Sequence, residues 1–335
     1  MSARLGHVPV PRQGETFSSI LLRLSSNHAA TAHELCAMLW PKFQFWTRDI
    51  DRTAADTLLE AVSRDTGLAR ATLEAATLRD VVEALGFPER LQGSQRGILP
   101  VGIYHRIRRR FGQQYCPACL AGQPPYLRRL WRLEILIACP VHGMLLRDAC
   151  PSCDAPFVPH REHSMVRRRC HRCGASLTKG QAETAAPHAA MLQQAALCAL
   201  SHSLDDVADA LAHGAITTPR WPVLDGVDND DLLDGIHRLC QLAAHVHDSS
   251  RNSPKARRET WTLLQTRERA AVMELVGRWL ADWPAAWIGW AKKHGLTRHY
   301  LEVSHGPWPA WVRVGFARLP YSFGIVGIRR PRARG

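Results

Sequence analysis

The sequence lacks the features that would place a protein in or across a membrane. No apolar run approaches the roughly 20 residues that a bilayer-spanning helix needs, and the first fourteen residues lack the apolar centre of a secretory signal. Hydrophobic residues make up 46% and charged residues 22%, so wholesale disorder is excluded. We therefore expect a soluble, cytoplasmic chain without membrane contact, and its 335 residues are enough for two or three domains.

Several signatures of catalysis are also missing. No G-x-x-x-x-G-K-[ST] loop is present, which disfavours ATP hydrolysis. No H-E-x-x-H pattern supplies a general base beside a metal, although one H-x-E triplet is present at His160-Arg161-Glu162, and no arrangement of acids stands out as a nuclease or transposase site. These absences predict that the protein is not an enzyme.

Cysteines are few for the length of the chain but strongly clustered. Seven of the ten fall within 58 residues, and six of those seven form C-x-x-C pairs. In a reducing compartment this spacing indicates metal binding rather than disulfides. The isolated cysteines Cys36, Cys198 and Cys240 stand among apolar neighbours and are expected to be inert core residues.

The clustered cysteines predict two zinc sites. Zn²⁺ takes four ligands in a tetrahedron, and each C-x-x-C or C-x-x-H turn offers two of them. The predicted ligands are Cys116, Cys119, Cys139 and His142 for the first site, and Cys150, Cys153, Cys170 and Cys173 for the second. Competition from His160, His163 or His171 and a cross-braced pairing of the four turns are the alternatives.

Each predicted site has a full set of four protein ligands, Cys₃His and Cys₄. No position is left for a catalytic water, so both Zn²⁺ ions are expected to be structural. Gly143 and Gly174 directly follow the second ligand of their turns, where a positive φ is expected. The intervals between ligands are too small and too rich in arginine to build a core unaided, so zinc would contribute folding energy.

The net charge of +13 is unevenly placed. Residues 101–180 carry 14 basic and 4 acidic side chains, residues 181–250 carry 2 and 10, and residues 251–335 carry 16 and 5. Two basic blocks indicate two contacts with polyanions, of which nucleic acid is favoured, although a merely solvated face is the alternative. The candidate nucleic-acid-binding residues are Arg106, Arg108, Arg109, Arg110, Arg128, Arg129, Arg167, Arg168 and Arg169.

Apolar periodicity predicts helices on both sides of the cysteine cluster. Helices are expected from Thr16, an N-cap, to Leu24 and over 32–39. A helix, a turn at Gly67 and a second helix over 54–76 outline a helix-turn-helix unit, although simple packing of two helices has the same pattern.

In the second half, helices are expected over 187–202, 205–213 and a segment that runs from the acidic 225–234 stretch to His247, with a linker over 247–255. Seven tryptophans follow, of which Trp279 and Trp283 share one helix face and Trp287 and Trp290 another, and this spacing favours a buried core over base stacking. The fold class is therefore mainly α: a helix-turn-helix domain over 1–104, a tandem zinc-finger module of ribbon or knuckle type over 105–180, and a helical domain over 181–335 with a basic tail.

The residues around the predicted ligands resemble the TniQ/TnsD family of transposition proteins. The resemblance is close over about residues 10–180, and the interval 159–169 is longer and richer in arginine than the family pattern. The strings that carry it are Gly14-Glu15-Thr16-Phe17-Ser18-Ser19-Ile20-Leu21-Leu22-Arg23-Leu24, Tyr115-Cys116-Pro117-x-Cys119-Leu120, Trp131-Arg132-Leu133, Cys139-Pro140-x-His142-Gly143, Leu145-Leu146-x-Asp148-x-Cys150-Pro151-x-Cys153, Cys170-x-x-Cys173-Gly174-x-x-Leu177 and Leu280-Ala281-Asp282-Trp283-Pro284.

The resemblance implies a non-catalytic adaptor for target-site selection in DNA recombination. It would link target DNA, or a targeting complex such as a CRISPR effector with guide RNA in a CRISPR-associated transposon, to the transposon's AAA+ ATPase regulator. Some family members are dimeric, so the resemblance also allows a homodimer. The setting would be a bacterial cytoplasm, with nucleoid association when DNA is bound. The alternatives are an autonomous sequence-specific DNA-binding protein for one attachment site, or a zinc-dependent nucleic-acid enzyme.

Overall fold

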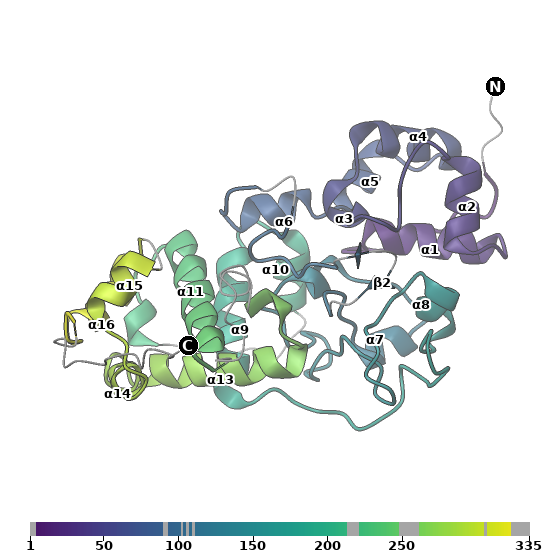
Figure 1. The fold of residues 1–335 in the computed structure, drawn as a ribbon. Coiled ribbons are helices and arrows are strands. Elements are labelled where there is room, and N and C mark those ends of the chain that lie inside the picture. The colour runs from purple at the N-terminus through teal and green to yellow at the C-terminus, as the bar shows by residue number, and fades with distance from the viewer. Residues whose placement is uncertain are drawn as a thin grey trace, which may run out of the picture.

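The N-terminal part is a compact set of short helices. The computed structural model describes residues 5–89, 93–101, 103–104, 107–108, 111–212, 221–247, 261–304 and 307–322. The helices of this part, drawn in purple and blue in Figure 1, are α1 (Phe17–Asn27), α2 (Ala32–Leu39), α3 (Ile50–Thr53), α4 (Asp56–Thr66), α5 (Arg70–Ala75) and α6 (Arg79–Ala84).

Local sequence accounts for where these helices begin and end. The Thr16 hydroxyl accepts a hydrogen bond from the Ser19 amide and caps α1. Thr31 and Glu34 form a reciprocal capping box at the start of α2. Gly67 adopts a φ of 76° and ends α4, so the predicted helix, glycine turn and helix are confirmed as α4 and α5.

The central part has little regular structure. Its elements are a two-stranded antiparallel sheet of β1 (Ile103–Tyr104) and β2 (Ile107–Arg108), helices α7 (Pro117–Ala121) and α8 (Ser164–Arg167), and 3₁₀ turns η1 (Arg129–Arg132) and η2 (Arg161–His163). Isolated backbone pairings such as Tyr115 with Arg147 and Ala149 with Pro156 join the remaining segments. Figure 1 shows this teal region between the N-terminal helices and the C-terminal bundle.

The C-terminal part is a helical bundle. Its elements are α9 (Pro187–Leu200), α10 (Asp205–Ala212), η3 (Pro222–Leu224), α11 (Asn229–His247), α13 (Thr266–Ala281), α14 (Ala285–Lys293), α15 (Arg298–Ser304) and α16 (Ala310–Phe316). Helix α9 packs closely on α13, where a Cβ on Gly277 would lie 2.6 Å from the carbonyl oxygen of His188. Glycine at this position therefore permits the close approach of the two backbones.

Tryptophan side chains form much of the core of this bundle. Trp287 is fully buried and stacks on Phe316 at 5.4 Å between ring centroids, and Trp279 packs on Trp290 at 4.5 Å. All eleven tryptophans of the chain are described, and each is buried or half-buried. The prediction of a tryptophan core is confirmed, and stacking of bases on exposed rings is not supported.

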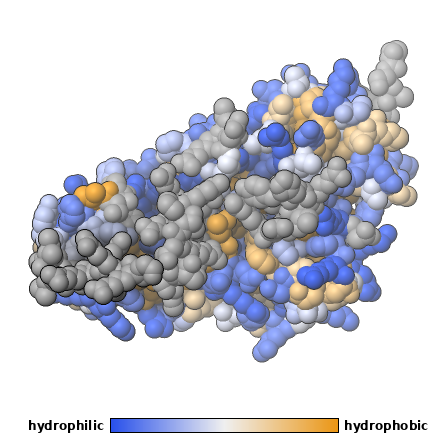
Figure 2. Space-filling view, viewed as in Figure 1, coloured by the Kyte–Doolittle hydropathy of each residue, from blue (hydrophilic) through white to orange (hydrophobic). Residues whose placement is uncertain are grey.

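The surface in Figure 2 is mostly hydrophilic, with scattered hydrophobic patches among the described residues. No helix in the described ranges is both long enough and apolar enough to span a membrane. The predicted linker after His247 and the basic tail from Arg329 lie outside the described residues. The mainly helical fold class with two Cys/His clusters at its centre is confirmed.

Candidate metal centres

The first cluster brings together the four side chains predicted as the Cys₃His site. Cys116 is the residue before α7 and Cys119 lies inside it, whereas Cys139 and His142 belong to a tight turn. Their ligand atoms all lie within 4.8 Å of one another, and the histidine presents Nδ1. Residues from two separate segments therefore converge on one point.

The distances in this cluster match a tetrahedron around one zinc ion. With zinc–sulfur bonds of about 2.3 Å and a zinc–nitrogen bond of about 2.0–2.1 Å, the edges are about 3.8 Å between sulfurs and about 3.6 Å between sulfur and nitrogen. The observed distances are 3.7 Å from Cys119 Sγ to Cys139 Sγ, and 3.6 Å from Cys116 Sγ and from Cys139 Sγ to His142 Nδ1, whereas Cys119 Sγ lies closer to His142 Nδ1, at 3.2 Å.

The second cluster brings together the four cysteines predicted as the Cys₄ site. The distance between Cys150 Sγ and Cys173 Sγ is 3.6 Å, and that between Cys153 Sγ and Cys170 Sγ is 3.7 Å. These are again the edges of a tetrahedron of the size that Zn²⁺ requires. The two consecutive sites fit the sequential pairing, and none of His160, His163 and His171 belongs to either cluster.

Three of the four ligand pairs each lie in a hairpin, and the three hairpins have the same backbone hydrogen bonds. In the hairpin of Cys150, its amide donates to the Ala155 carbonyl at 2.9 Å, the Asp154 amide donates to the Cys150 carbonyl at 3.0 Å, and the Ser152 amide points at its sulfur at 3.4 Å. The hairpins that start at Cys139 and Cys170 repeat the two backbone bonds. An amide directed at sulfur stabilises the thiolate that a metal needs.

The residue after the second ligand is left-handed in each of these hairpins. Gly143 and Gly174 have φ values of 65° and 72°, which confirms the positive φ expected there. Asp154 holds the same position in the remaining hairpin with a φ of 54°, a conformation that aspartate tolerates better than most residues. The first pair is held differently, because Cys116 directly precedes α7 and Cys119 lies inside it, with Pro117 at the first helical position.

One thiol in each cluster has a lowered pKa, whereas neighbouring sulfurs and burial raise the pKa of Cys116, Cys119, Cys150 and Cys153. Hydrogen bonds from the thiols of Cys116 and Cys119 lower the pKa of Cys139 to about 2. In the second cluster, the backbone amide of Ala175 lowers the pKa of Cys173 to about 7. The donor chemistry and the tetrahedral spacing together fit a zinc ion at each cluster.

Buried arginines join the central part to the N-terminal helices. Arg132 is fully buried and pairs with Asp49 and with Asp51, while its guanidinium also donates to the Leu99 carbonyl at 2.8 Å. Burial raises the pKa of Asp51 to about 6, although Arg132 opposes that rise. A paired, buried cation of this kind fixes the position of one part against the other.

A second buried network joins the central part to α13. The Asp148 carboxylate accepts hydrogen bonds from the amide and the hydroxyl of Thr266, at 2.7 and 2.9 Å. Gln114 accepts from Thr266 and from the fully buried Arg269, which also donates to the Glu134 carbonyl at 2.6 Å. The residues around the metal clusters are therefore tied to helices on both sides, and the proposed boundaries near 104 and 180 separate parts that share buried contacts.

Sequence reasoning missed both networks. Their members are polar residues scattered over the whole chain, and their partners are between 33 and 155 residues away. The only available signal was that Arg132 and Asp148 stand inside the strings that resemble the TniQ/TnsD family. Ion pairs of this range depend on the tertiary fold, which local patterns do not encode.

The predicted nucleic-acid-binding arginines have different environments. The side chains of Arg106, Arg108, Arg109 and Arg110 lie outside the described residues. Arg129 is buried and pairs with Asp80 and Asp206. We exclude it from the predicted nucleic-acid contacts, because its charge is neutralised and its side chain is not accessible. Arg128 is half-buried over the Tyr126 ring. Arg167 and Arg169 are exposed, and the half-buried Arg168 donates to the Gly122 carbonyl.

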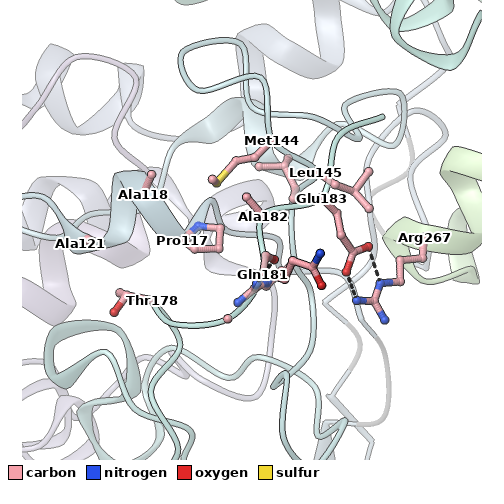
Figure 3. Close-up of a pocket in the computed structure, with 13 residues that line it drawn as sticks. Pro117, Ala118, Ala121, Met144, Leu145, Thr178, Gln181, Ala182, Glu183 and Arg267 are labelled. Atoms are coloured by element: carbon pink, nitrogen blue, oxygen red, sulfur yellow. Dashed lines mark hydrogen bonds and ion pairs between the residues drawn. The ribbon is translucent and has the colours of Figure 1, made fainter. Parts of the chain in front are cut away.

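A shallow pocket borders the first metal cluster. Its apolar side is formed by Pro117 and Ala118 of α7 together with Met144, and an ion pair between Glu183 and Arg267 closes one side (Figure 3). Cys116 and His142 do not line the pocket, so it does not open onto the ligand atoms.

Comparison with known proteins gives one positive finding. A model of the TniQ family matches residues 7–146, a span that begins before α1 and ends just after the last ligand of the first cluster. A search of curated proteins found no match. The resemblance predicted from the residues around the ligands is thus confirmed over this span. Over residues 7–146 the chain is therefore similar to the TniQ family, in agreement with the motifs that lie in this span.

Proposed function

We propose that this protein is a non-catalytic adaptor for target selection in transposition. It would link target DNA, or a targeting complex, to the transposon's AAA+ regulator. The observation that carries the proposal is the match of residues 7–146 to the TniQ family, the family that the sequence motifs around the ligands also resemble.

The two metal clusters support an adaptor rather than an enzyme. Each cluster has four protein ligands, and a tetrahedral zinc ion held by four protein ligands has no position for a reacting water. We propose that both clusters hold structural Zn²⁺. The ions would hold three hairpins and α7 in place and so maintain the surface between the two helical parts.

The buried networks support a rigid link. Arg132 ties the metal-bearing part to Asp49 in the N-terminal part, and Thr266 ties it to α13 in the C-terminal part. An adaptor that positions two partners needs a fixed relation between its binding surfaces. These buried polar contacts supply it, because breaking them leaves charges uncompensated away from water.

The alternative of an autonomous reader of one attachment site has less support. Helix α5, the second helix of the helix-turn-helix-like unit, is only six residues long. Its Arg70 is engaged by Asp56 and Glu74, so it does not offer a free cation to a DNA groove. We favour recruitment in which specificity comes at least in part from another component.

A reconstituted transposition reaction tests the proposal. Transposase, AAA+ regulator and donor DNA would be combined with and without this protein, and insertions would be mapped by sequencing. We expect targeted insertion only when the protein is present, and binding of the purified protein to the AAA+ regulator. Insertion that is equally frequent and equally targeted without the protein would overturn the proposal, as would DNA cleavage by the protein alone.

A further inference from the structure

The segment that contains the second metal cluster is rich in arginine. Residues 150–180 carry six basic and two acidic side chains. Four thiolates and one Zn²⁺ ion have a combined charge of −2, so the segment keeps a net positive charge when the site is filled. Most of this charge comes from the interval 159–169 and the turn that follows it.

Three of these arginines, which we call the arginine face, stand within six consecutive residues: Arg167, Arg169 and Arg172. All three are exposed, and no carboxylate of the described residues forms an ion pair with any of them. The Arg169 guanidinium donates to the Gly174 carbonyl, at 3.1 Å across the hairpin of the metal site. Their charges are therefore available to an external anion.

The arginine face lies on a well-anchored support. The Arg169 amide donates to the Ser164 carbonyl, and the Leu177 amide donates to the Arg168 carbonyl at 2.9 Å. Met165 is fully buried and packs beneath α1, where the Ser19 hydroxyl lies 3.7 Å from its sulfur. His160 stacks on Trp46 at 4.9 Å between ring centroids. The arginines are thus presented by backbone that is fixed on both sides.

In the helix-turn-helix-like unit, by contrast, Arg64, Arg70 and Arg79 are paired with carboxylates of the protein. The Asp56 carboxylate accepts from both Arg70 and Arg79 at 2.7 Å, and the Glu74 carboxylate accepts from the same two guanidinium groups at 3.0 Å. Arg64 pairs with its neighbour Asp65. Cations that are neutralised within the protein release few counterions from a polyanion, so this unit has little attraction for a phosphate backbone.

The aromatic residues distinguish double-stranded from single-stranded nucleic acid. Proteins that hold single strands stack the bases on exposed aromatic rings. No tryptophan of this chain is exposed, and Trp46, which stacks on His160 of the same segment, is buried, as is Tyr115. Exposed guanidinium groups without a stacking platform suit the phosphates of an intact duplex.

We propose that the arginine face is a contact surface for the phosphate backbone of duplex DNA, and that the second metal site holds it in position. This inference rests on the proposed adaptor function and identifies where the protein would touch its target. Contacts of this kind position a protein on a duplex without reading sequence. That agrees with an adaptor whose specificity comes from another component.

A triple variant of the full-length protein tests the proposal. Arg167, Arg169 and Arg172 would be changed to glutamine, and the affinity for a random-sequence duplex would be measured over a range of salt concentrations. Each lost phosphate contact should reduce the slope of log K against log salt by about 0.9, so we expect a decrease of about 2.7. The matched control changes Arg64, Arg70 and Arg79 to glutamine and should leave the slope unchanged.

Zinc content and melting temperature of both variants would be measured in parallel. If the triple variant loses zinc, Arg167→Gln alone remains informative, because Arg167 lies outside the hairpin, and its slope should fall by about 0.9. An unchanged slope with intact zinc and stability would overturn the inference, as would a loss of binding to single-stranded RNA that exceeds the loss for duplex DNA. Either result would leave the adaptor function standing, because that function fails only if targeted insertion does not need the protein.

Discussion

Substitution of Cys150 by serine is expected to empty the second metal site. Cys150 supplies a sulfur 3.6 Å from that of Cys173, accepts the Ser152 amide and closes its hairpin with Ala155. Structural zinc sites bind with about 10–16 kcal/mol, which divided evenly over four ligands is about 2.5–4 kcal/mol for each ligand. Zinc affinity at this site should therefore fall by about 10²- to 10³-fold.

The assay is zinc stoichiometry of the purified variant, with a chromophoric chelator that competes for the metal. We expect one firmly held zinc ion per chain in place of two. The melting temperature should also fall, because the hairpins that end at Ala155 and Ala175 lose the metal ion that joins them. Cys198→Ser is the matched control, since Cys198 lies in α9 outside both clusters, and it should keep two zinc ions. Two firmly bound zinc ions in the Cys150→Ser protein, with unchanged melting, would refute the ligand assignment.

Three further predictions concern the buried contacts. Arg132→Met leaves Asp49 and Asp51 without their cation and should lower the free energy of unfolding by about 3–5 kcal/mol in urea denaturation; a change below 1 kcal/mol would contradict the role of this ion pair. The pKa of Asp51 is raised to about 6 in the folded state, so its protonation contributes to the free energy of unfolding at low pH. This contribution is lost as pH rises from about 4 to about 6. Unfolding of Asp51→Asn should lack this part of the pH dependence, and an identical pH profile would speak against it. Gly277→Ala places a Cβ 2.6 Å from the His188 carbonyl oxygen and should lower the melting temperature, whereas Gly289→Ala in open space should raise it slightly by improving helix propensity; equal effects would reject tight packing of α9 on α13.

Local features of the fold were predictable because their causes are local. The capping residue Thr16, the bounds of α2 and the glycine turn at Gly67 follow from rules that act over four or five residues. The ligand clusters were predictable for a similar reason, since each C-x-x-C turn supplies two ligands at fixed spacing and the number of turns leaves few pairings.

The charged surface could not be predicted in the same way. Arg129 stands in a basic run of the sequence, but the fold buries it against Asp80 and Asp206. Arg70 and Arg79 are also neutralised, by acids up to 23 residues away. Counting charges along the chain identifies a basic segment, but only the three-dimensional arrangement shows which guanidinium groups remain available.

The extent of the central module was also beyond local patterns. Gln114 and Asp148 contact Thr266, which lies more than a hundred residues further along the chain. These contacts make the metal-bearing segment part of a larger buried assembly, whereas the ligand spacing alone suggested a separate module. The two helical parts and the metal sites therefore depend on one another for stability.

Metal analysis of the freshly purified protein, combined with chelation, tests the central claim most directly. The account predicts two zinc ions per chain, both at clusters of four protein ligands, and cooperative loss of tertiary structure in near-ultraviolet circular dichroism when a strong chelator removes them. A metal-free protein with the same dichroism and melting temperature would contradict it.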